Sequence, residues 1–72
     1  MSRLANCNKT AKVVRALRRA GFTQREGGRH TVMQHPNGRF TTVPRHPLIN
    51  TRTLRLIVKQ CGLTEDEFIA LY

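Results

Sequence analysis

Turn-forming residues divide the middle of this chain into short segments, and their spacing constrains the fold more than any other feature of the sequence. The turn signals are Gly21, Gly27-Gly28, Pro36-Asn37-Gly38 and Pro44. Glycine and Asn-Gly permit positive φ angles, and proline cannot donate to a strand ladder. Residues 22–26, 29–35 and 39–43 are therefore predicted to be three strands joined by tight turns.

Apolar residues at helical spacing lie on both sides of these strands. Before them, Thr10 is predicted to cap a helix that runs to about Ala20, with Gly21 as its stop. After them, a second helix is predicted from about Thr51 to Cys61. The apolar positions of the two helices are Val13, Val14, Ala16, Leu17 and Ala20, and Leu54, Ile57, Val58 and Cys61.

A third, short helix is predicted to begin at Thr64. Thr64 and Glu67 have the spacing of a capping box, and Leu63 and Phe68 have the spacing of a hydrophobic staple. The acidic run 65–67 also interacts favourably with a helix N-terminus. This acidic cluster therefore has a structural explanation and need not be catalytic.

The predicted element order, α-β-β-β-α-α, defines the fold class. It is an α+β fold with a three-stranded antiparallel sheet and helices packed on one face, the double-stranded-RNA-binding-like layout. At 72 residues we expect a single domain over residues 1–72, with residues 1–9 loosely ordered. A domain of this size buries only about 60% of the surface of its unfolded chain, so we expect a site on the surface or at an edge.

The charge distribution favours a polyanionic partner. The chain has 13 Lys and Arg residues against 4 Asp and Glu residues, a formal net charge of +9. Residues 1–63 hold all 13 cations and one acid, Glu26, which leaves them at +12. Most of the cations are arginines, which suit bidentate contact with phosphate. A field of this strength attracts nucleic acid.

Other classes of protein are excluded by what the sequence lacks. No apolar run approaches the roughly 20 residues of a membrane-spanning helix, and no secretory signal peptide is recognisable. Cys7 and Cys61 lie far apart without a CxxC pair, so we expect free thiols in a reducing cytoplasm rather than a disulfide scaffold. No pair of ligands has metal-site spacing, so we expect neither a metal nor a small-molecule cofactor.

Histidines are the remaining candidates for chemistry on RNA, which needs a base, an acid and cations for the phosphate. The acids cannot form a two-metal site, and no glycine-rich phosphate loop is present. His35, at a turn entry, is interpreted as structural, and His46 in a loop as solvated or in contact with phosphate. His30 follows two glycines that leave the backbone open to a ligand. The residues alone leave the choice among the three histidines open.

Several short motifs follow one another along the chain. They are Gly21-Phe22, Gly28-Arg29-His30, His35-Pro36-Asn37-Gly38-Arg39, Val43-Pro44-Arg45-His46, and the stretch from Thr53 to Phe68. In this order they resemble the HicA family of toxin ribonucleases from type II toxin–antitoxin systems. The resemblance implies metal-independent cleavage of mRNA that arrests growth, with His30 as the catalytic residue. It also implies a HicB-like antitoxin that covers the active surface.

One position departs from the pattern of that family. Arg29 stands in the middle of the Gly-x-His motif, where a small residue is usual. Strand alternation predicts that its side chain points away from the face of His30, so we expect the site to tolerate it.

The predicted mechanism combines one histidine with several cations. His30 would act as general base or acid in attack of a 2′-hydroxyl on the adjacent phosphodiester, and its proton-transfer partner is unassigned. The predicted RNA contacts are Arg29, Arg39, Arg45, Arg52 and Arg55. The last two stand at the start of the second helix, whose free amides also favour phosphate.

Three alternatives remain from the sequence. A non-catalytic RNA-binding module of the same fold would keep the basic surface without needing His30. A helix-turn-helix over Leu54 to Leu71 would bind DNA, but its recognition helix would begin with three acids facing the phosphates. The chain could also be an inactive or antitoxin-dependent remnant of the toxin family.

Overall fold

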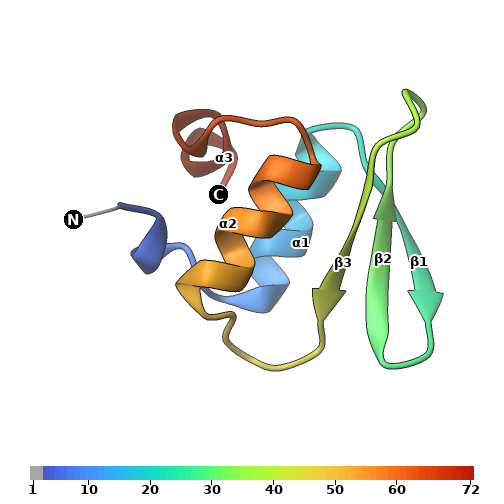
Figure 1. Ribbon diagram of the computed structural model, residues 1–72, viewed down its shortest axis with the longest axis horizontal. Coiled ribbons are helices and arrows are strands. Elements are labelled where there is room, and N and C mark those ends of the chain that lie inside the picture. The colour runs from blue at the N-terminus through green and yellow to red at the C-terminus, as the bar shows by residue number, and fades with distance from the viewer. Residues whose placement is uncertain (1–2) are drawn as a thin grey trace.

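The computed structural model describes residues 3–72 and places three helices on one side of a three-stranded sheet (Figure 1). The sheet is an antiparallel meander in the order β1-β2-β3. The elements are a 3-10 helix η1 (Arg3–Asn6), α1 (Thr10–Arg19), β1 (Thr23–Gly27), β2 (His30–Gln34), β3 (Phe40–Pro44), α2 (Thr51–Gln60) and α3 (Glu65–Leu71). This α+β arrangement is consistent with the predicted double-stranded-RNA-binding-like fold.

The predicted strands are confirmed, with small shifts at their ends. Arg29 and His35 flank β2 instead of belonging to it, and Arg39 precedes β3. Arg29 is therefore a turn residue, and the expectation drawn from strand alternation does not apply to its side chain. Gly21, with φ of 100°, ends α1 as predicted, because a left-handed backbone cannot continue the helix.

The start of α1 differs from the prediction. Lys9 occupies the N-cap position and makes no side-chain capping bond, so Thr10 is the first helical residue and not the cap. The Thr10 hydroxyl instead donates a hydrogen bond to the backbone carbonyl of His46. The hydroxyl therefore connects α1 to the β3–α2 loop, a contact between residues far apart in the sequence.

The prediction that residues 1–9 are loosely ordered is wrong for residues 3–9. Residues 3–6 form η1, and its Leu4 is fully buried. Cys7 is also buried, and η1 packs against α2 and α3. The burial of these two apolar side chains explains why the segment is held against the domain. Residues 1 and 2 lie outside the described part of the chain.

The two faces of the sheet differ in burial. Thr31 and Met33 of β2 and Val43 of β3 are buried against the helices. His30 starts β2 on the opposite, open face, which it shares with the side chain of Val32. The buried core is formed by Leu4, Cys7, Val13, Ala16, Leu17, Phe22, Met33, Val43, Ile49, Leu54, Ile57, Val58, Cys61 and Phe68.

The predicted capping box at the start of α3 is confirmed. Thr64 Oγ1 accepts a hydrogen bond from the Glu67 amide at 3.0 Å, and Glu67 Oε1 accepts one from the Thr64 amide at 2.9 Å. Two hydrogen bonds with Thr64 lower the pKa of Glu67. The bond from the Thr64 backbone amide has the larger effect, and the bond with the Thr64 side chain has the smaller one. The acidic residues at this helix start thus have the structural role that the sequence suggested.

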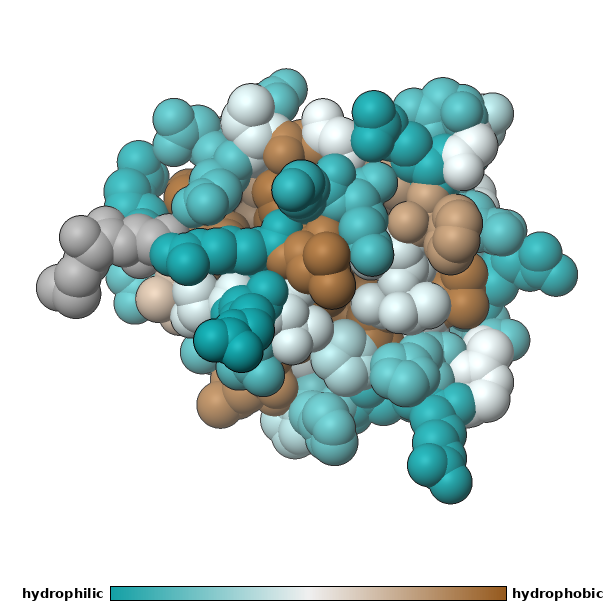
Figure 2. Space-filling view, in the orientation of Figure 1, coloured by the Kyte–Doolittle hydropathy of each residue, from teal (hydrophilic) through white to brown (hydrophobic). Residues whose placement is uncertain are grey.

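The surface is strongly basic and contains a few exposed apolar side chains. All 13 Lys and Arg residues are exposed. Figure 2 shows hydrophilic side chains over most of one face, interrupted by apolar patches. Phe40, Leu48 and Leu56 are each more than half exposed. None of the helices in residues 3–72 is long and apolar enough to cross a membrane.

Candidate active site

His30 lies at one end of the sheet, where the β1–β2 turn meets the end of β3. It pairs with Gly27 of β1 on one side and with Pro44 of β3 on the other. Its side chain is exposed, and within residues 3–72 no protein group forms a hydrogen bond with its imidazole. The ring is therefore accessible to a ligand from the solvent side.

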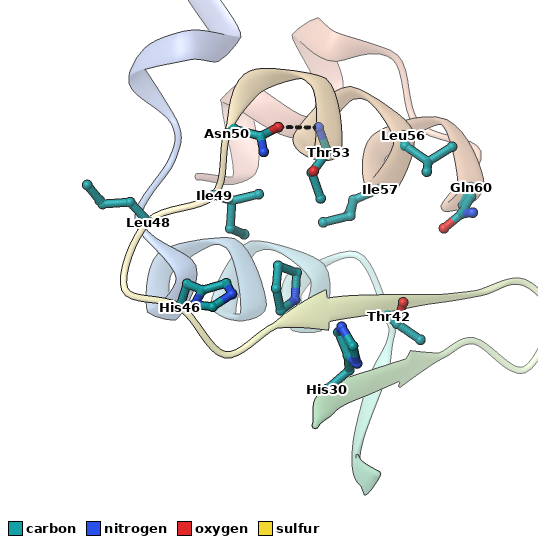
Figure 3. A pocket seen from close by; sticks show the side chains of 11 residues that line it. His30, Thr42, His46, Leu48, Ile49, Asn50, Thr53, Leu56, Ile57 and Gln60 are labelled. Atoms are coloured by element: carbon teal, nitrogen blue, oxygen red, sulfur yellow. Dashed lines mark hydrogen bonds between the residues drawn. The ribbon is translucent and has the colours of Figure 1, made fainter. Parts of the chain in front are cut away.

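A cavity of about 370 Å³ opens beside His30, between β3 and α2 (Figure 3). Its lining combines polar groups with aliphatic side chains from the sheet, the β3–α2 loop and α2. The lining residues are His30, Thr42, Pro44, His46, Leu48, Ile49, Asn50, Thr53, Leu56, Ile57 and Gln60. A mixed wall of this kind can hold a ligand that has both polar edges and an apolar face, as a nucleobase has.

The β3–α2 loop, which supplies part of this wall, is fixed by backbone hydrogen bonds to the segment before α1. The amide of Thr10 donates to the Pro47 carbonyl at 3.1 Å, and the amide of Ile49 donates to the Asn8 carbonyl at 2.9 Å. The Thr10 hydroxyl also donates to the carbonyl of His46, the residue before Pro47. The loop therefore presents its side chains from a defined backbone.

The wall formed by α2 is also anchored by hydrogen bonds. Asn50 Oδ1 accepts a bond from the Thr53 amide at 2.8 Å, so Asn50 caps the helix. At the other end of the helix, the Thr41 hydroxyl bonds to Gln60 Oε1 at 2.7 Å. Since Thr41 is fully buried on β3, this bond ties α2 to the edge of the sheet.

Two predicted RNA contacts neighbour His30 along the chain or across the sheet but differ in orientation: Arg29 precedes it, and Arg45 follows Pro44, its partner on β3. Arg29 lies in the β1–β2 turn immediately before His30 and is exposed. Arg45 lies on the helix side of the sheet, where its guanidinium forms an ion pair with Glu26 at 2.5 Å. Glu26 is the strand partner of Thr31, which is buried against the helices, so the side chain of Glu26 lies on the helix-covered face of the sheet. Arg45 is absent from the lining of the cavity, so the structure does not bring it together with His30.

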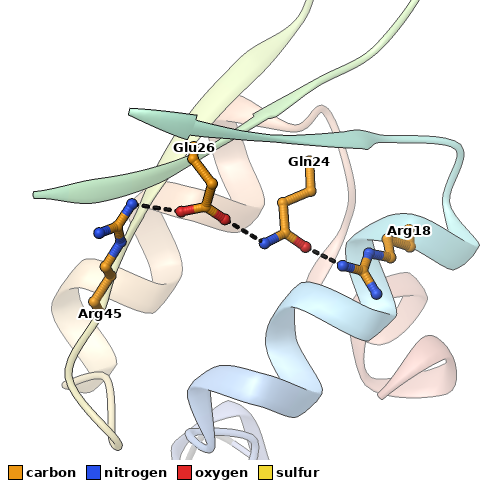
Figure 4. Close-up of polar contacts among 4 residues, drawn as sticks. All are labelled: Arg18, Gln24, Glu26 and Arg45. Carbon is orange, nitrogen blue, oxygen red and sulfur yellow. Dashed lines mark hydrogen bonds and ion pairs between the residues drawn. The ribbon is translucent and has the colours of Figure 1, made fainter. Parts of the chain in front are cut away.

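The Glu26–Arg45 pair belongs to a longer chain of polar contacts (Figure 4). Gln24 Nε2 donates to Glu26 Oε1 at 2.9 Å, and Arg18 of α1 donates to Gln24 Oε1. The only acid in the basic part of the sequence is thus used to connect β1, the β3–α2 loop and, through Gln24, α1.

The other three predicted contacts lie away from the cavity. Arg39 stands at the far end of the sheet, where its side chain packs over Gly62 at the end of α2. Arg52 and Arg55 are exposed on α2 but do not line the cavity, and Arg55 faces Glu65 of α3 at 3.9 Å. They form part of the basic surface around the site and not part of its wall.

Two further residues were not assigned to the site from the sequence. His46, interpreted there as solvated or in contact with phosphate, lines the same cavity as His30. Arg25 lies on the open face of β1, paired with Val32 and two residues before Gly27. Strand alternation from Gly27 could have found Arg25, whereas His46 required the path of the loop.

Groups that could bind a metal are dispersed in the part of the chain that the structure describes. Within residues 3–72, no three His, Cys, Asp or Glu side chains come together as a metal site would need. Cys7 and Cys61 are buried free thiols. Burial raises the pKa of Cys61 to about 11, and the nearby Arg39 cation offsets part of this increase. A thiol with this pKa is a weak nucleophile at neutral pH.

The fold and the site together define a small, basic α+β protein with an exposed histidine beside a cavity. Residues 10–63 match the family described as HicA toxin of bacterial toxin-antitoxin systems. Because the match covers well over half of the 72 residues, the chain belongs to the HicA toxin family. No curated protein matches the chain at a significant level.

Proposed function

We propose that this protein is an endoribonuclease toxin that cleaves mRNA without a metal ion and inhibits growth, with His30 as its catalytic residue. The observation that carries the proposal is the position of His30, exposed and without a protein partner among residues 3–72, at the mouth of the cavity. Membership of a toxin family and a basic surface support the same conclusion.

The reaction begins with RNA bound by its phosphates across the basic surface. One proton-transfer group removes the proton of a 2′-hydroxyl, which attacks the adjacent phosphorus. The bond to the 5′-oxygen then breaks, and this oxygen takes up a proton. His30 performs one of these two transfers. The products are a 2′,3′-cyclic phosphate and a 5′-hydroxyl end.

The arginines of the basic surface differ in their position relative to His30. Arg29 adjoins His30 in the β1–β2 turn, so we expect it to contact the reacting phosphate. Arg25 lies on the same open face, but its Nη1 donates to Gln34 Oε1 at 3.3 Å, toward the other end of β2, so we expect it to contact a neighbouring phosphate. Arg39, Arg45, Arg52 and Arg55 are proposed to contact more distant phosphates of the same strand. Arg45 contributes less than an unpaired arginine because Glu26 already neutralises it.

A comparison of binding and cleavage tests this function. We expect purified His30→Ala to cleave single-stranded RNA about 10²- to 10⁴-fold more slowly than wild type in excess chelator. Its affinity for a non-cleavable 2′-deoxy analogue should stay within a few-fold. Induced expression of the wild type, but not of His30→Ala, should arrest growth and deplete mRNA.

A non-catalytic RNA-binding module is the alternative that the same fold allows. It would bind RNA equally well with and without His30 and would cleave none in a nuclease-free preparation. Cleavage that survives in His30→Ala, or that requires magnesium, contradicts the proposed mechanism.

We also propose that a HicB-like antitoxin covers the cavity. Leu48 and Leu56 border the cavity and are 58% and 54% exposed. Exposed aliphatic side chains beside a basic surface suit a partner with an apolar contact and acidic residues around it. Substitution of both leucines by serine should weaken binding of the cognate antitoxin by at least 10-fold, measured by calorimetry.

A further inference from the structure

A second imidazole lines the same cavity as His30. His46 comes from the β3–α2 loop, and Figure 3 shows its ring and the ring of His30 both projecting toward the cavity from different elements. Pro44 of β3 is paired with His30 across the sheet, and His46 follows Pro44 by two positions. The two histidines are separated by 16 positions in the sequence and line one cavity only in the folded protein.

The backbone of His46 is held in place more firmly than a solvent-exposed loop residue requires. Its carbonyl accepts the Thr10 hydroxyl, and the next carbonyl, of Pro47, accepts the Thr10 amide at 3.1 Å. Leu48 then forms a bridge with Lys9. Three successive loop residues are thus attached to the start of α1. The side chain of His46 is exposed, but the backbone from which it projects is held in place.

Cleavage of RNA by its 2′-hydroxyl needs two proton-transfer groups, one on each side of the reacting phosphate. The attacking 2′-oxygen and the leaving 5′-oxygen lie on opposite sides of the phosphorus in an in-line displacement. The proton donor and proton acceptor must therefore approach from two sides of one phosphate. His30 and His46 supply two imidazoles from different elements to the lining of one cavity, and imidazole can both accept and donate a proton near neutral pH.

We propose that His46 is the second proton-transfer residue, and that His30 and His46 act as a base and acid pair on one phosphodiester. This inference rests on the proposed ribonuclease function. One imidazole takes the proton of the 2′-hydroxyl as the bond from the 2′-oxygen to phosphorus forms. The other gives its proton to the 5′-oxygen as the bond from phosphorus to that oxygen breaks. No metal, oxidant or further reactant enters the balance.

The experiment compares two substrates that differ only in the leaving atom. One is a short RNA, and the other carries sulfur in place of the bridging 5′-oxygen at the cleaved bond. A thiolate leaves without being protonated, since thiols have a pKa near 8.5, so the sulfur substrate does not need the acid. We expect His30→Ala and His46→Ala each to slow cleavage of ordinary RNA about 10²- to 10⁴-fold, mainly in kcat. On the sulfur substrate, one variant should return to within about 10-fold of wild type and the other should not.

Controls separate this role from binding and from folding. Leu48→Ala changes the border of the cavity beside His46 without removing a proton-transfer group, so it should affect both substrates equally. The melting temperature of His46→Ala should match wild type, because within residues 3–72 the hydrogen bonds of His46 involve its backbone and not its imidazole. An increase in KM alone for His46→Ala, or an equal loss on both substrates by both variants, overturns the pairing. Full activity in His46→Ala also overturns it, whereas full activity in His30→Ala overturns the proposed function.

Discussion

One histidine begins β2 and another follows its last residue, and these two histidines have opposite environments. His35, just after β2, is half-buried, and its ring meets the Phe22 ring edge-on with centroids 5.0 Å apart. Its Nδ1 accepts a hydrogen bond from the Asn37 amide at 3.1 Å. His30, at the first position of β2, is exposed and borders a cavity. The strand therefore begins with a histidine available for chemistry and is followed by a histidine used for structure.

The glycines next to the two histidines repeat this difference. A Cβ atom added at Gly21 would lie 3.0 Å from Nε2 of His35, so the backbone there is packed against the ring. A Cβ atom added at Gly28, beside the His30 end, would meet nothing within 4 Å. The comparison teaches that the residue type does not decide the role. The role of each histidine depends on whether neighbouring groups already contact its ring and hydrogen bond to it.

The largest expected effect is on catalysis and contrasts the two histidines directly. His30→Ala should reduce RNA cleavage by about 10²- to 10⁴-fold, whereas His35→Ala should stay within about threefold of wild type when assayed well below its melting temperature. Initial rates on one labelled RNA measure both. Equal losses in the two variants would show that the ends of the strand are not functionally distinct.

The next largest effect is on the alkylation rate of the Cys61 thiol. Cys61 lies at the end of α2, near the His35 end of the sheet, where Arg39 packs between the β2–β3 turn and α2. Because burial raises the pKa of Cys61 from 9.0 to about 11, its thiolate fraction at pH 8 should be about 100-fold lower than that of an ordinary cysteine. Alkylation by iodoacetamide, followed by mass spectrometry, should be at least that much slower in the folded protein than in denaturant. Rapid alkylation of the folded protein would mean that this end is open.

The glycine pair predicts a difference in stability. Both residues have positive φ, 100° at Gly21 and 28° at Gly28, so alanine is strained at either site. Gly28→Ala should cost about 1–2 kcal/mol for the backbone alone. Gly21→Ala should cost about 2–3 kcal/mol because the methyl group also crowds His35. Urea unfolding of the two variants provides the measurement, and a larger loss at Gly28 would reverse the comparison.

The smallest effect is the structural contribution of His35 itself. His35→Ala removes the edge contact with Phe22 and the acceptor for the Asn37 amide, and together these are worth about 1–2 kcal/mol. The free energy of unfolding should fall by that amount, while His30→Ala should change it by less than about 0.5 kcal/mol. A stability loss in His30→Ala as large as in His35→Ala would assign His30 a structural role as well.

The sequence was sufficient for the fold because its signals are local. Glycine and proline positions marked the strand ends to within one or two residues, and the Thr64–Glu67 capping box was confirmed as drawn from spacing alone. The start of the chain was misjudged because the burial of Leu4 depends on contacts with α2 and α3, which lie far away in the sequence. Polar composition near a terminus says nothing about such contacts.

The site was less predictable because its walls come from separate elements. Exposure of His30 agrees with the expectation of an open approach after two glycines, but the cavity beside it depends on α2 and the β3–α2 loop. The orientation of Arg45 depended on its pairing with Glu26, 19 positions earlier in the sequence. Charge counting predicts that arginines surround the site, but not which of them face it.

The attachment of the β3–α2 loop to Asn8 and Thr10 also affects when the site exists. The cavity needs its wall from Asn50 to Gln60 as well as the anchor near residue 10, so most of the chain must be present before it can form. During synthesis the strands can pair first, because they emerge earlier and their turns are local. A nascent or truncated chain that stops before Gln60 therefore carries His30 without the cavity beside it.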